Sequence, residues 1–574
     1  MNKHLLYLIT IALFAIPNVH SAQTTPKKFI FTGAARGYFF GDRLDQDLAI
    51  EDTITIPRLN SGHVMADLGL NIRPNKNMEI LGMVRVRNDY GGFWGSGVTF
   101  DIRQLYVKGV IGGVVRYQLG DINYRLTRYT FWNNDQEFLQ NTPTIFKQQF
   151  DVVNYDHFHN LDNSWRQQGG AAEWGLVFNK FIEELEFHTF ATRVRASNNS
   201  SINDRIFTGG NVQILQSKYL QLGWNYVNLI DVEGTSRNNT LFRNPVSSFS
   251  AKGNWDNATW DATAEAEVGT SRTRFLNDAE APENDGSFSE IRALFKHKKS
   301  GLFARGTYKR VDSDFRSPGA QTKRLNFTGI PTAFQRTGND QNLRPLTIMD
   351  LMRESSMYNM QLQPYLMTFL PKYDNITPFG DATPNRQGMI VEAGWKTQKG
   401  LSVEVMHANL QETRGEGTPE ARKFTRNQVN IKWMRDKISK EFPRRAAVEM
   451  SLRQDQTNRP GTEFYRGVEL TTTVASLGLE FELYEKLDFI AGWQFIEYDG
   501  FDYTAVRNNY AEIFNFIEYN VKGKENMKAA GLRYRFSEKS FLSAQVNMFD
   551  FDDADVNTAH YAVRQFMMLY QINF

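Results

Sequence analysis

The feature that most constrains this chain is a two-residue alternation of apolar and polar side chains that recurs from about residue 30 to the end. It fills residues 80–88, 261–268, 429–434 and 447–453, where apolar side chains on one face oppose charged or amide side chains on the other. Successive side chains of a β-strand point to opposite faces, so the alternation predicts strands with one apolar and one wet face. A soluble sandwich can also place charges on one face, and the repetition along the whole chain therefore carries the prediction of an all-β fold.

The N-terminal residues predict export. Lys3 precedes an apolar stretch, Leu5–Ile16, that only Thr10 interrupts, and small residues at Ser21 and Ala22 offer a cleavage site. About 12 apolar residues are too few to cross a ~30 Å hydrocarbon core as a helix, which argues against a membrane anchor. We therefore predict a secretory signal peptide over residues 1–22 and a single domain over residues 23–574.

The remaining chain contains no apolar run of the length that a transmembrane helix needs, roughly 18 residues or more. The full chain has an aromatic content of 13% and a mean hydropathy of −0.48, a combination that suits strands with one wet face better than helical globules. Only helices and closed barrels satisfy every backbone hydrogen bond in lipid. If this chain spans a membrane, it must do so as a barrel.

Short and long connections alternate along the chain. Ten short turns, for example at residues 73–77, 216–218 and 398–400, are separated by longer stretches rich in Asn, Asp, Gly and Arg. Short periplasmic turns and long extracellular loops are typical of outer-membrane barrels. Ten hairpins, a first strand near 30–40 and a last strand near 561–574 predict a transmembrane antiparallel up-and-down β-barrel of about 22 strands, within a range of 18 to 24.

The last predicted strand ends on an aromatic residue. Apolar side chains alternate there with Gln565, Met567, Leu569, Gln571 and Asn573, and they include Phe566, Tyr570, Ile572 and the final Phe574. The pattern resembles the C-terminal signature of outer-membrane barrels, and this resemblance implies recognition by the barrel-assembly machinery. The alternative is an ordinary terminal strand of a soluble sheet.

At the level of architecture the whole mature chain resembles Gram-negative outer-membrane porins, including alginate-export-like barrels and their relatives in the Bacteroidota. The resemblance rests on the alternation and the C-terminal strand rather than on a long motif. It implies a barrel with an aqueous lumen. A barrel of this size also resembles TonB-dependent transporters, but strands are predicted soon after the cleavage site, so we expect no N-terminal plug domain and no energised uptake.

Two insertions are long enough to fill part of a wide lumen. Residues 121–169 contain Arg125, Arg128, Trp132 and Trp165, and residues 312–386 contain several arginines and a Met-rich apolar stretch. Loops of this length in a compact domain are usually functional or disordered. We expect at least one of them to fold into the lumen and narrow it; the alternative is a surface loop that covers the mouth.

The segment 76–130 is rich in cations, which makes anion selectivity a hypothesis. Alternation places Arg85, Arg87, Lys108 and Arg116 on the polar face of their strands, and Arg125 and Arg128 follow in the first insertion. An arginine on the lipid face near the midplane costs roughly 2–4 kcal/mol, so we predict that these six residues line the pore. Rings of Arg or Lys select anions, although acidic strands such as 261–267 could balance them.

Catalytic and metal-binding patterns are weak. Asp156-His157-Phe158-His159 could offer two metal ligands but has no identifiable third, and the acidic residues 550–557 lack the Gly and Glu of a calcium loop. The sequence has neither a nucleophile elbow nor a phosphate loop, and without cysteine it can use no thiol chemistry. We expect no catalytic residue, no metal and no cofactor. A net charge of +2 gives no reason to expect nucleic acid as a partner.

The function predicted from the sequence is a porin-type channel of the outer membrane for small polar solutes, with anions and oligosaccharides as candidate cargo. The expected surroundings are outer-membrane lipid and lipopolysaccharide, and the pattern leaves both a homotrimer and a lipoprotein partner open. The first alternative is a barrel that anchors a partner lipoprotein or a secretion or assembly component. The second is a barrel-embedded hydrolase, for which no Ser/His/acid set can be named.

Overall fold

The computed structural model describes residues 28–46, 58–90, 98–132, 142–157, 167–197, 199–320, 370–436, 443–507, 512–537, 539–554 and 559–574. The predicted signal peptide lies outside the described residues. So do parts of both long insertions, including most of the Met-rich stretch, and residues 158–166 with His159.

The described residues form strands and a single helix. The helix is α2, Thr144–His157, and the strands are β1 (Phe29–Gln46), β2 (Arg58–Asn75), β3 (Met78–Asp89), β4 (Val98–Ile111), β5 (Val115–Ile122), β6 (Gln167–Val177), β7 (Glu184–Arg195), β8 (Arg205–Ser217), β9 (Leu220–Asp231), β10 (Leu241–Asp256), β11 (Trp260–Leu276), β12 (Asn284–His297), β13 (Leu302–Val311), β14 (Arg386–Lys396), β15 (Leu401–Gln411), β16 (Lys423–Arg435), β17 (Ala446–Arg459), β18 (Val468–Tyr484), β19 (Leu487–Arg507), β20 (Ile513–Ser537), β21 (Ser540–Asp553) and β22 (Ala559–Asn573). No helix in these ranges is long and apolar enough to cross a bilayer.

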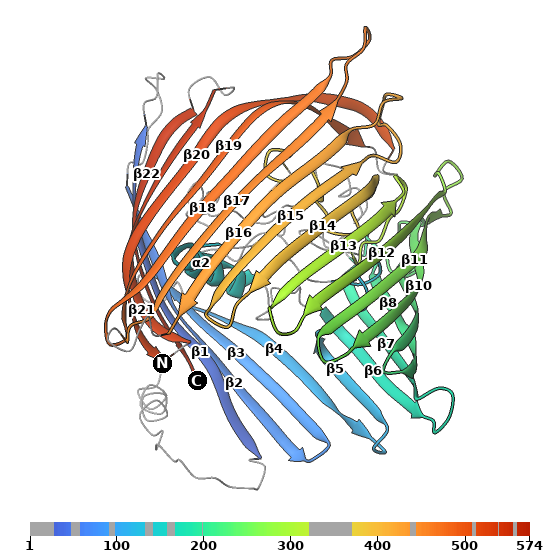
Figure 1. Ribbon diagram of the computed structural model, residues 1–574. Helices are drawn as coiled ribbons and strands as arrows, with labels where there is room; N and C mark the ends of the chain where they lie inside the picture. The colour runs from blue at the N-terminus through green and yellow to red at the C-terminus, as the bar shows by residue number, and fades with distance from the viewer. Residues whose placement is uncertain are drawn as a thin grey trace.

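The 22 strands form one antiparallel sheet that closes on itself (Figure 1). Each strand pairs with the next along the chain, and β1 pairs with β22 from Ala34↔Asn573 to Gln46↔Tyr561. Beyond this register, Gly33 and Phe574 exchange two backbone hydrogen bonds of 2.9 and 3.0 Å. Closure leaves the sheet without a free edge strand at this seam. The predicted antiparallel barrel of about 22 strands is confirmed.

The hairpin turns lie where the sequence predicts them. Each of the ten short turns joins a pair of consecutive strands, from β2–β3 through β20–β21. At the β4–β5 turn Gly112 and Gly113 have φ angles of 61° and 74°, in the left-handed region that glycine enters without a steric penalty. The long connections, including the two insertions, join consecutive strands at their other end.

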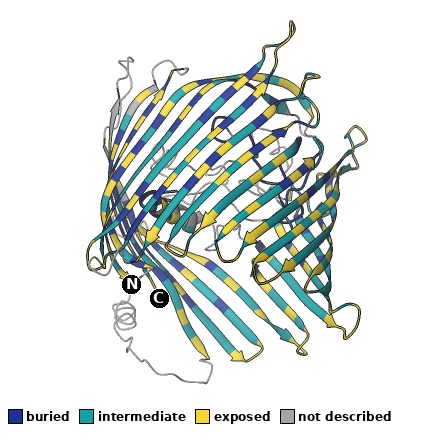
Figure 2. Ribbon diagram, in the orientation of Figure 1, coloured by how far each residue is buried: buried dark blue, intermediate teal, exposed yellow. Residues whose placement is uncertain are grey.

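Burial alternates along the strands, as Figure 2 shows in stripes. On β22, Phe566, Met568 and Tyr570 are exposed outward, whereas Met567 and Leu569 are fully buried. Exposed apolar side chains recur on the outer face of most strands. An outward apolar face and an inward polar or packed face is the arrangement that a bilayer requires of a barrel.

A β-bulge interrupts the alternation between β3 and β4. The register shifts between Met83 and Val84, which pair with Gln104 and Ile102, so Arg103 is the extra residue. Its side chain is 2% exposed and turns to the inner face. The bulge thus breaks the two-residue alternation of β4 at Arg103, whose side chain lies on the inner face.

Candidate functional site

One arc of the inner wall is covered by helix α2, which Figure 1 shows inside the ring of strands. The arc consists of β18–β22 and β1, whose inward side chains include Tyr38, Ile490 and Met567. Ile145 and Phe146 of α2 are fully buried against them. A Cβ added to Gly492 of β19 would lie 2.5 Å from Ile145 Cγ2, so this glycine allows the helix to approach the wall closely. We call this region the helix-covered arc.

The C-terminal end of α2 is held by arginines. The last turn of a helix leaves carbonyl groups without intrahelical partners. Arg36 Nη1 donates to the Val152 carbonyl at 3.4 Å, and Arg103 donates to the Tyr155 carbonyl. Cations near a helix C-terminus also interact favourably with the helix dipole. The bulge residue Arg103 therefore has a structural role in docking the helix.

Asp67 of β2 links the helix to the wall. Its carboxylate accepts two hydrogen bonds of 2.8 Å from Arg85 and a third from the Tyr155 hydroxyl. The Asp67 side chain has no exposed surface. Burial, followed by the charge and the hydrogen bond of Asp67, raises the pKa of Tyr155 to about 12, so the phenol stays protonated and can donate. Arg87 of β3 pairs in turn with Asp89 at 2.8 Å.

The opposite arc of the inner wall carries the segment 122–132. Tyr129 stacks on Phe288 with ring centroids 4.0 Å apart, and its hydroxyl donates to Glu290 at 2.6 Å. Phe131 packs between Phe190 and Phe207. The segment therefore lies against the inner faces of β7, β8 and β12, and it is joined there by residues 312–320 through a hydrogen bond of 3.0 Å from Trp132 to the Gly319 carbonyl.

Residues 370–385 pass between the two arcs. The Tyr373 hydroxyl donates to Glu525 of β20 at 2.6 Å, and Asp374 accepts from Arg426 of β16 at 3.0 Å. Farther along the segment, Asp381 lies 3.5 Å from both Arg128 and Arg292. Burial alone would raise the pKa of Asp374, but the charges of Arg426 and Arg453 and two backbone donors bring it below its ordinary value. The segment is thus anchored by charge at both ends.

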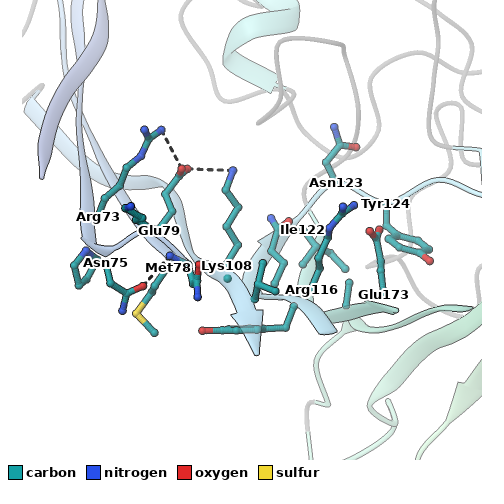
Figure 3. A pocket seen from close by; sticks show the side chains of 18 of the residues that line it. Arg73, Asn75, Met78, Glu79, Lys108, Arg116, Ile122, Asn123, Tyr124 and Glu173 are labelled. Atoms are coloured by element: carbon teal, nitrogen blue, oxygen red, sulfur yellow. Dashed lines mark hydrogen bonds and ion pairs between the residues drawn. The ribbon is translucent and has the colours of Figure 1, made fainter. Parts of the chain in front are cut away.

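A pocket of about 660 Å³ lies at the short-turn end of β2–β6 (Figure 3). Glu79 holds Lys108 at 3.1 Å and Arg73 at 3.2 Å, while Arg116 lies near Glu173. Five cations and two carboxylates are among the residues that line it: Lys28, Arg73, Lys76, Lys108, Arg116, Glu79 and Glu173. We call it the turn-end pocket, and its surplus charge is positive.

Two further pockets lie on either side of Arg128 and Trp132, which line both. The first, about 390 Å³, is walled by β8–β12 and is named the amide pocket after Asn211, Gln213, Gln221 and Asn225. The second, about 350 Å³, is walled by β12–β16 and is named the arginine pocket after Arg292, Arg305 and Arg426. Inward folding of the segment 122–132 therefore divides this arc of the lumen into two chambers.

The structure places the six predicted pore-lining residues in different settings. Arg85 and Arg87 are buried in ion pairs, and Arg125 is half-buried in the segment 122–132. Lys108 and Arg116 line the turn-end pocket, and Arg128 separates the other two pockets. They do not form one ring. Of the predicted assembly signal, Phe566, Tyr570 and Phe574 are exposed on the outer face and Ile572 is half-buried.

Sequence reasoning did not predict the amide pocket or helix α2. Ile145, Gln149 and Val152 recur at helical spacing after Pro143, a signal that could have indicated the helix. The amide pocket depends on cross-strand register, which one sequence does not reveal. Among the described residues, no group of three or more His, Cys, Asp or Glu side chains is arranged to hold a metal. The Asp156–His159 candidate falls largely outside the residues whose side chains are described.

No protein-family profile and no curated protein matches the chain. Solved structures match over most of its length at low similarity. OccK5 (OpdH) of Pseudomonas aeruginosa is 10% identical, with 95% of this chain and 98% of that chain covered and a TM-score of 0.36. OpdK with vanillate, also of Pseudomonas aeruginosa, is 10% identical over 95% and 98%, with a TM-score of 0.35.

Wzi of Escherichia coli, described as a carbohydrate-binding β-barrel involved in group 1 capsule assembly, is 11% identical over 75% of this chain and 81% of that chain, with a TM-score of 0.34. Similarity at this level does not say what this chain carries or binds. The narrower resemblance to alginate-export-like barrels stays a prediction.

Proposed function

We propose that the chain is an outer-membrane channel for passive diffusion of small polar solutes. The observation that carries the proposal is a closed wall that is apolar outside, combined with a lumen that the described residues fill only partly. Segments 122–132 and 370–385 and helix α2 bind the inner face, and polar pockets of several hundred Å³ lie between them. A large barrel whose interior is not filled by side chains leaves an aqueous path.

Charge along this path supports a weak preference for anions at the short-turn end. Most inward cations of the wall are neutralised locally, as Arg85 is by Asp67. The turn-end pocket differs, because its cations outnumber its carboxylates. Lys and Arg side chains that face a pore favour anions. Export through the predicted signal peptide and recognition of the C-terminal strand by the assembly machinery belong to the same proposal.

Conductance in planar lipid bilayers tests the proposal. We expect discrete current steps in symmetric KCl. In a KCl gradient we expect a reversal potential whose sign shows chloride to be more permeant than potassium. Absence of current from protein that shows folded β-sheet circular dichroism would contradict the channel. A reversal potential of the opposite sign, which shows potassium to be more permeant, would contradict only the anion preference.

A further inference from the structure

The wall of the amide pocket is a patch of hydrogen-bonding side chains set by strand register. Across β8, β9 and β10, Asn211 pairs with Asn225 and Asn225 with Ser248. One row along, Gln213 pairs with Gly223, which pairs with Ser250. Side chains at paired positions share a face, so these rows lie together on the inner wall. The patch is polar and mostly uncharged, unlike the ion-paired wall elsewhere in the lumen.

A glycine keeps the centre of this patch open. Gly223 occupies the position between Gln213 and Ser250, and a Cβ added there would lie 2.5 Å from Ser250 Oγ. On the same sheet, a Cβ added to Gly253 of β10 would meet no atom closer than 3.9 Å. Any larger side chain at position 223 would therefore enter the pocket, whereas one at position 253 would not.

One buried polar atom in the pocket, Asn211 Oδ1, has no hydrogen-bond partner within the described residues. Asn211 is 8% exposed, yet its side-chain oxygen accepts no hydrogen bond. Glu267 accepts from Ser248 and from Thr127, both at 2.7 Å, and both bonds end on the same oxygen, Oε1. Buried polar groups normally have hydrogen-bond partners, and one without a partner needs an explanation. A bound solute that donates hydrogen bonds would supply it.

The side of the pocket opposite the amides is formed by Arg128 and Trp132. Trp132 adds an aromatic surface to an otherwise polar lining, and Arg128 is engaged by Glu290 at 3.6 Å. Small-molecule sites commonly have volumes of ~300–1,000 Å³ and combine apolar surface with a few placed polar groups. The amide pocket, at about 390 Å³, lies within this range of volumes, and Trp132 supplies aromatic surface beside its polar groups.

The charges of the pocket decide which class of polar solute fits. An anion would meet Glu265, Glu267 and Glu290 against two cations, and Lys252 is already paired with Glu265 at 3.2 Å. A hard metal cation needs several converging oxygen ligands, and no group of three or more His, Cys, Asp or Glu side chains among the described residues is arranged to hold one. Hydroxyl groups both donate and accept, as the amides of Asn and Gln also do.

We propose that the amide pocket is a binding site for a neutral polyhydroxylated solute, such as one unit of a neutral oligosaccharide. Ring hydroxyls donate to the Asn211 oxygen, one hydroxyl forms a hydrogen bond with the Glu267 carboxyl group, the amides complete the hydrogen bonds, and the apolar face of the sugar ring packs on Trp132. The inference rests on the proposed channel, because the pocket is reached through the lumen.

Isothermal titration calorimetry of the full chain in detergent tests the site without requiring ion flow. Maltotriose is the neutral probe, and trigalacturonic acid is an anionic probe of the same length. We expect saturable binding of maltotriose and weaker binding of the acid. We also expect no binding of permethylated maltotriose, which has lost its hydroxyl donors. Absence of maltotriose binding, or equal binding of the acid or of the permethylated sugar, would overturn the proposal.

Variants locate the site. Asn211→Leu removes the acceptor and Gly223→Val fills the pocket; each should weaken maltotriose binding by about tenfold or more, the scale of one lost hydrogen bond. Gly253→Val, on the same sheet but outside the pocket, should leave the affinity unchanged. Circular dichroism checks that each variant folds. If a variant does not fold, the proposal is tested by the binding of the three probes to the unmodified chain. Unchanged affinity in both folded pocket variants would refute the site.

The outcomes separate this inference from the proposed function. Ion current without maltotriose binding would support the proposed channel and refute the proposed sugar site. Maltotriose binding without ion current would support the proposed sugar site and refute the proposed channel.

Discussion

The two arcs of the inner wall contrast in what their inward side chains do. In the helix-covered arc, apolar inward side chains of β1 and β18–β22 form a cluster with Ile145, Phe146 and Val152 of α2, beside buried polar side chains such as Gln545 and Asn547. In the arc from β8 to β16 the inward positions of the amide and arginine pockets are mostly amides, hydroxyls and charges, and the pockets remain open. Both arcs have the same strand geometry and the same apolar outer face.

The difference suggests an account in which the side chains of the inner face influence where the lumen is filled. Burial of apolar inward side chains stabilises the fold by roughly 25 cal/mol for each Å² removed from water. A segment of the chain that packs on them is therefore stabilised there. Amides and ion pairs are already hydrated or satisfied and gain little from cover. Variants that convert one kind of arc toward the other test this account.

The largest expected effect comes from the buried pair that anchors the helix-covered arc. Arg85→Ala leaves the unexposed Asp67 carboxylate without its bidentate partner. Removal of one member of a buried ion pair costs ~3–5 kcal/mol in the free energy of unfolding. Urea unfolding in lipid vesicles measures it. The matched control, Lys298→Ala, removes a partner of the largely exposed Asp256 and should cost ~1 kcal/mol or less.

Release of the helix should widen the lumen. Gly492→Leu places side-chain atoms where Ile145 of α2 packs, so the helix cannot dock. We expect single-channel conductance to rise by roughly twofold or more, because this arc of the lumen then opens to water. The control is Gly306→Leu, at a strand position with no atom within 4 Å of an added Cβ. Equal conductance in both variants would show that α2 does not limit the current.

Acid should release the segment 370–385 only at low pH. The pKa of Asp374 is lowered from 3.8 in the folded protein, so protonation weakens its anchor. A lowered folded-state pKa gives stabilisation that is full above about 3.8 and is lost as the pH falls through the lower folded value. We expect conductance to stay constant from neutral pH to about 4 and to change below it.

The variant Asp374→Asn removes the titrating group of that anchor. It should show the altered conductance already at neutral pH and lack the acid transition. An exposed aspartate at a short turn provides the control, and Asp256→Asn should behave like the unmodified chain. An acid transition that persists in Asp374→Asn would assign the pH response to another group.

The smallest expected effect concerns selectivity. Arg116→Ala removes one of the five cations of the turn-end pocket, which is separate from the amide pocket and the arginine pocket. We expect the permeability ratio of chloride to potassium to fall by roughly twofold or less, while conductance is kept. Reversal potentials in a KCl gradient measure the ratio. Lys298→Ala, at a turn on another hairpin, should leave it unchanged.

The strands were predictable from the sequence because every strand that faces oil and water must alternate. The polar inner face fails at the helix-covered arc, where Met567 and Leu569 were assigned to the polar side and instead belong to the buried apolar cluster that includes α2. The unbroken apolar run 566–570 is the signal of burial on both faces. The pockets could not be predicted, because Gly223 meets Ser250 only through a register that no local pattern encodes.

The seam between β1 and β22 has a kinetic consequence. The residues that pair there, such as Arg36 and Gln571, come from opposite ends of the described chain. Such contacts are the most non-local that a polypeptide can make, and folding rates fall as contacts become more distant in sequence. The barrel therefore cannot close until the last strand has formed, and the intermediates before closure have two unpaired edge strands. A truncated chain would keep these two edges, which can pair with other chains and aggregate.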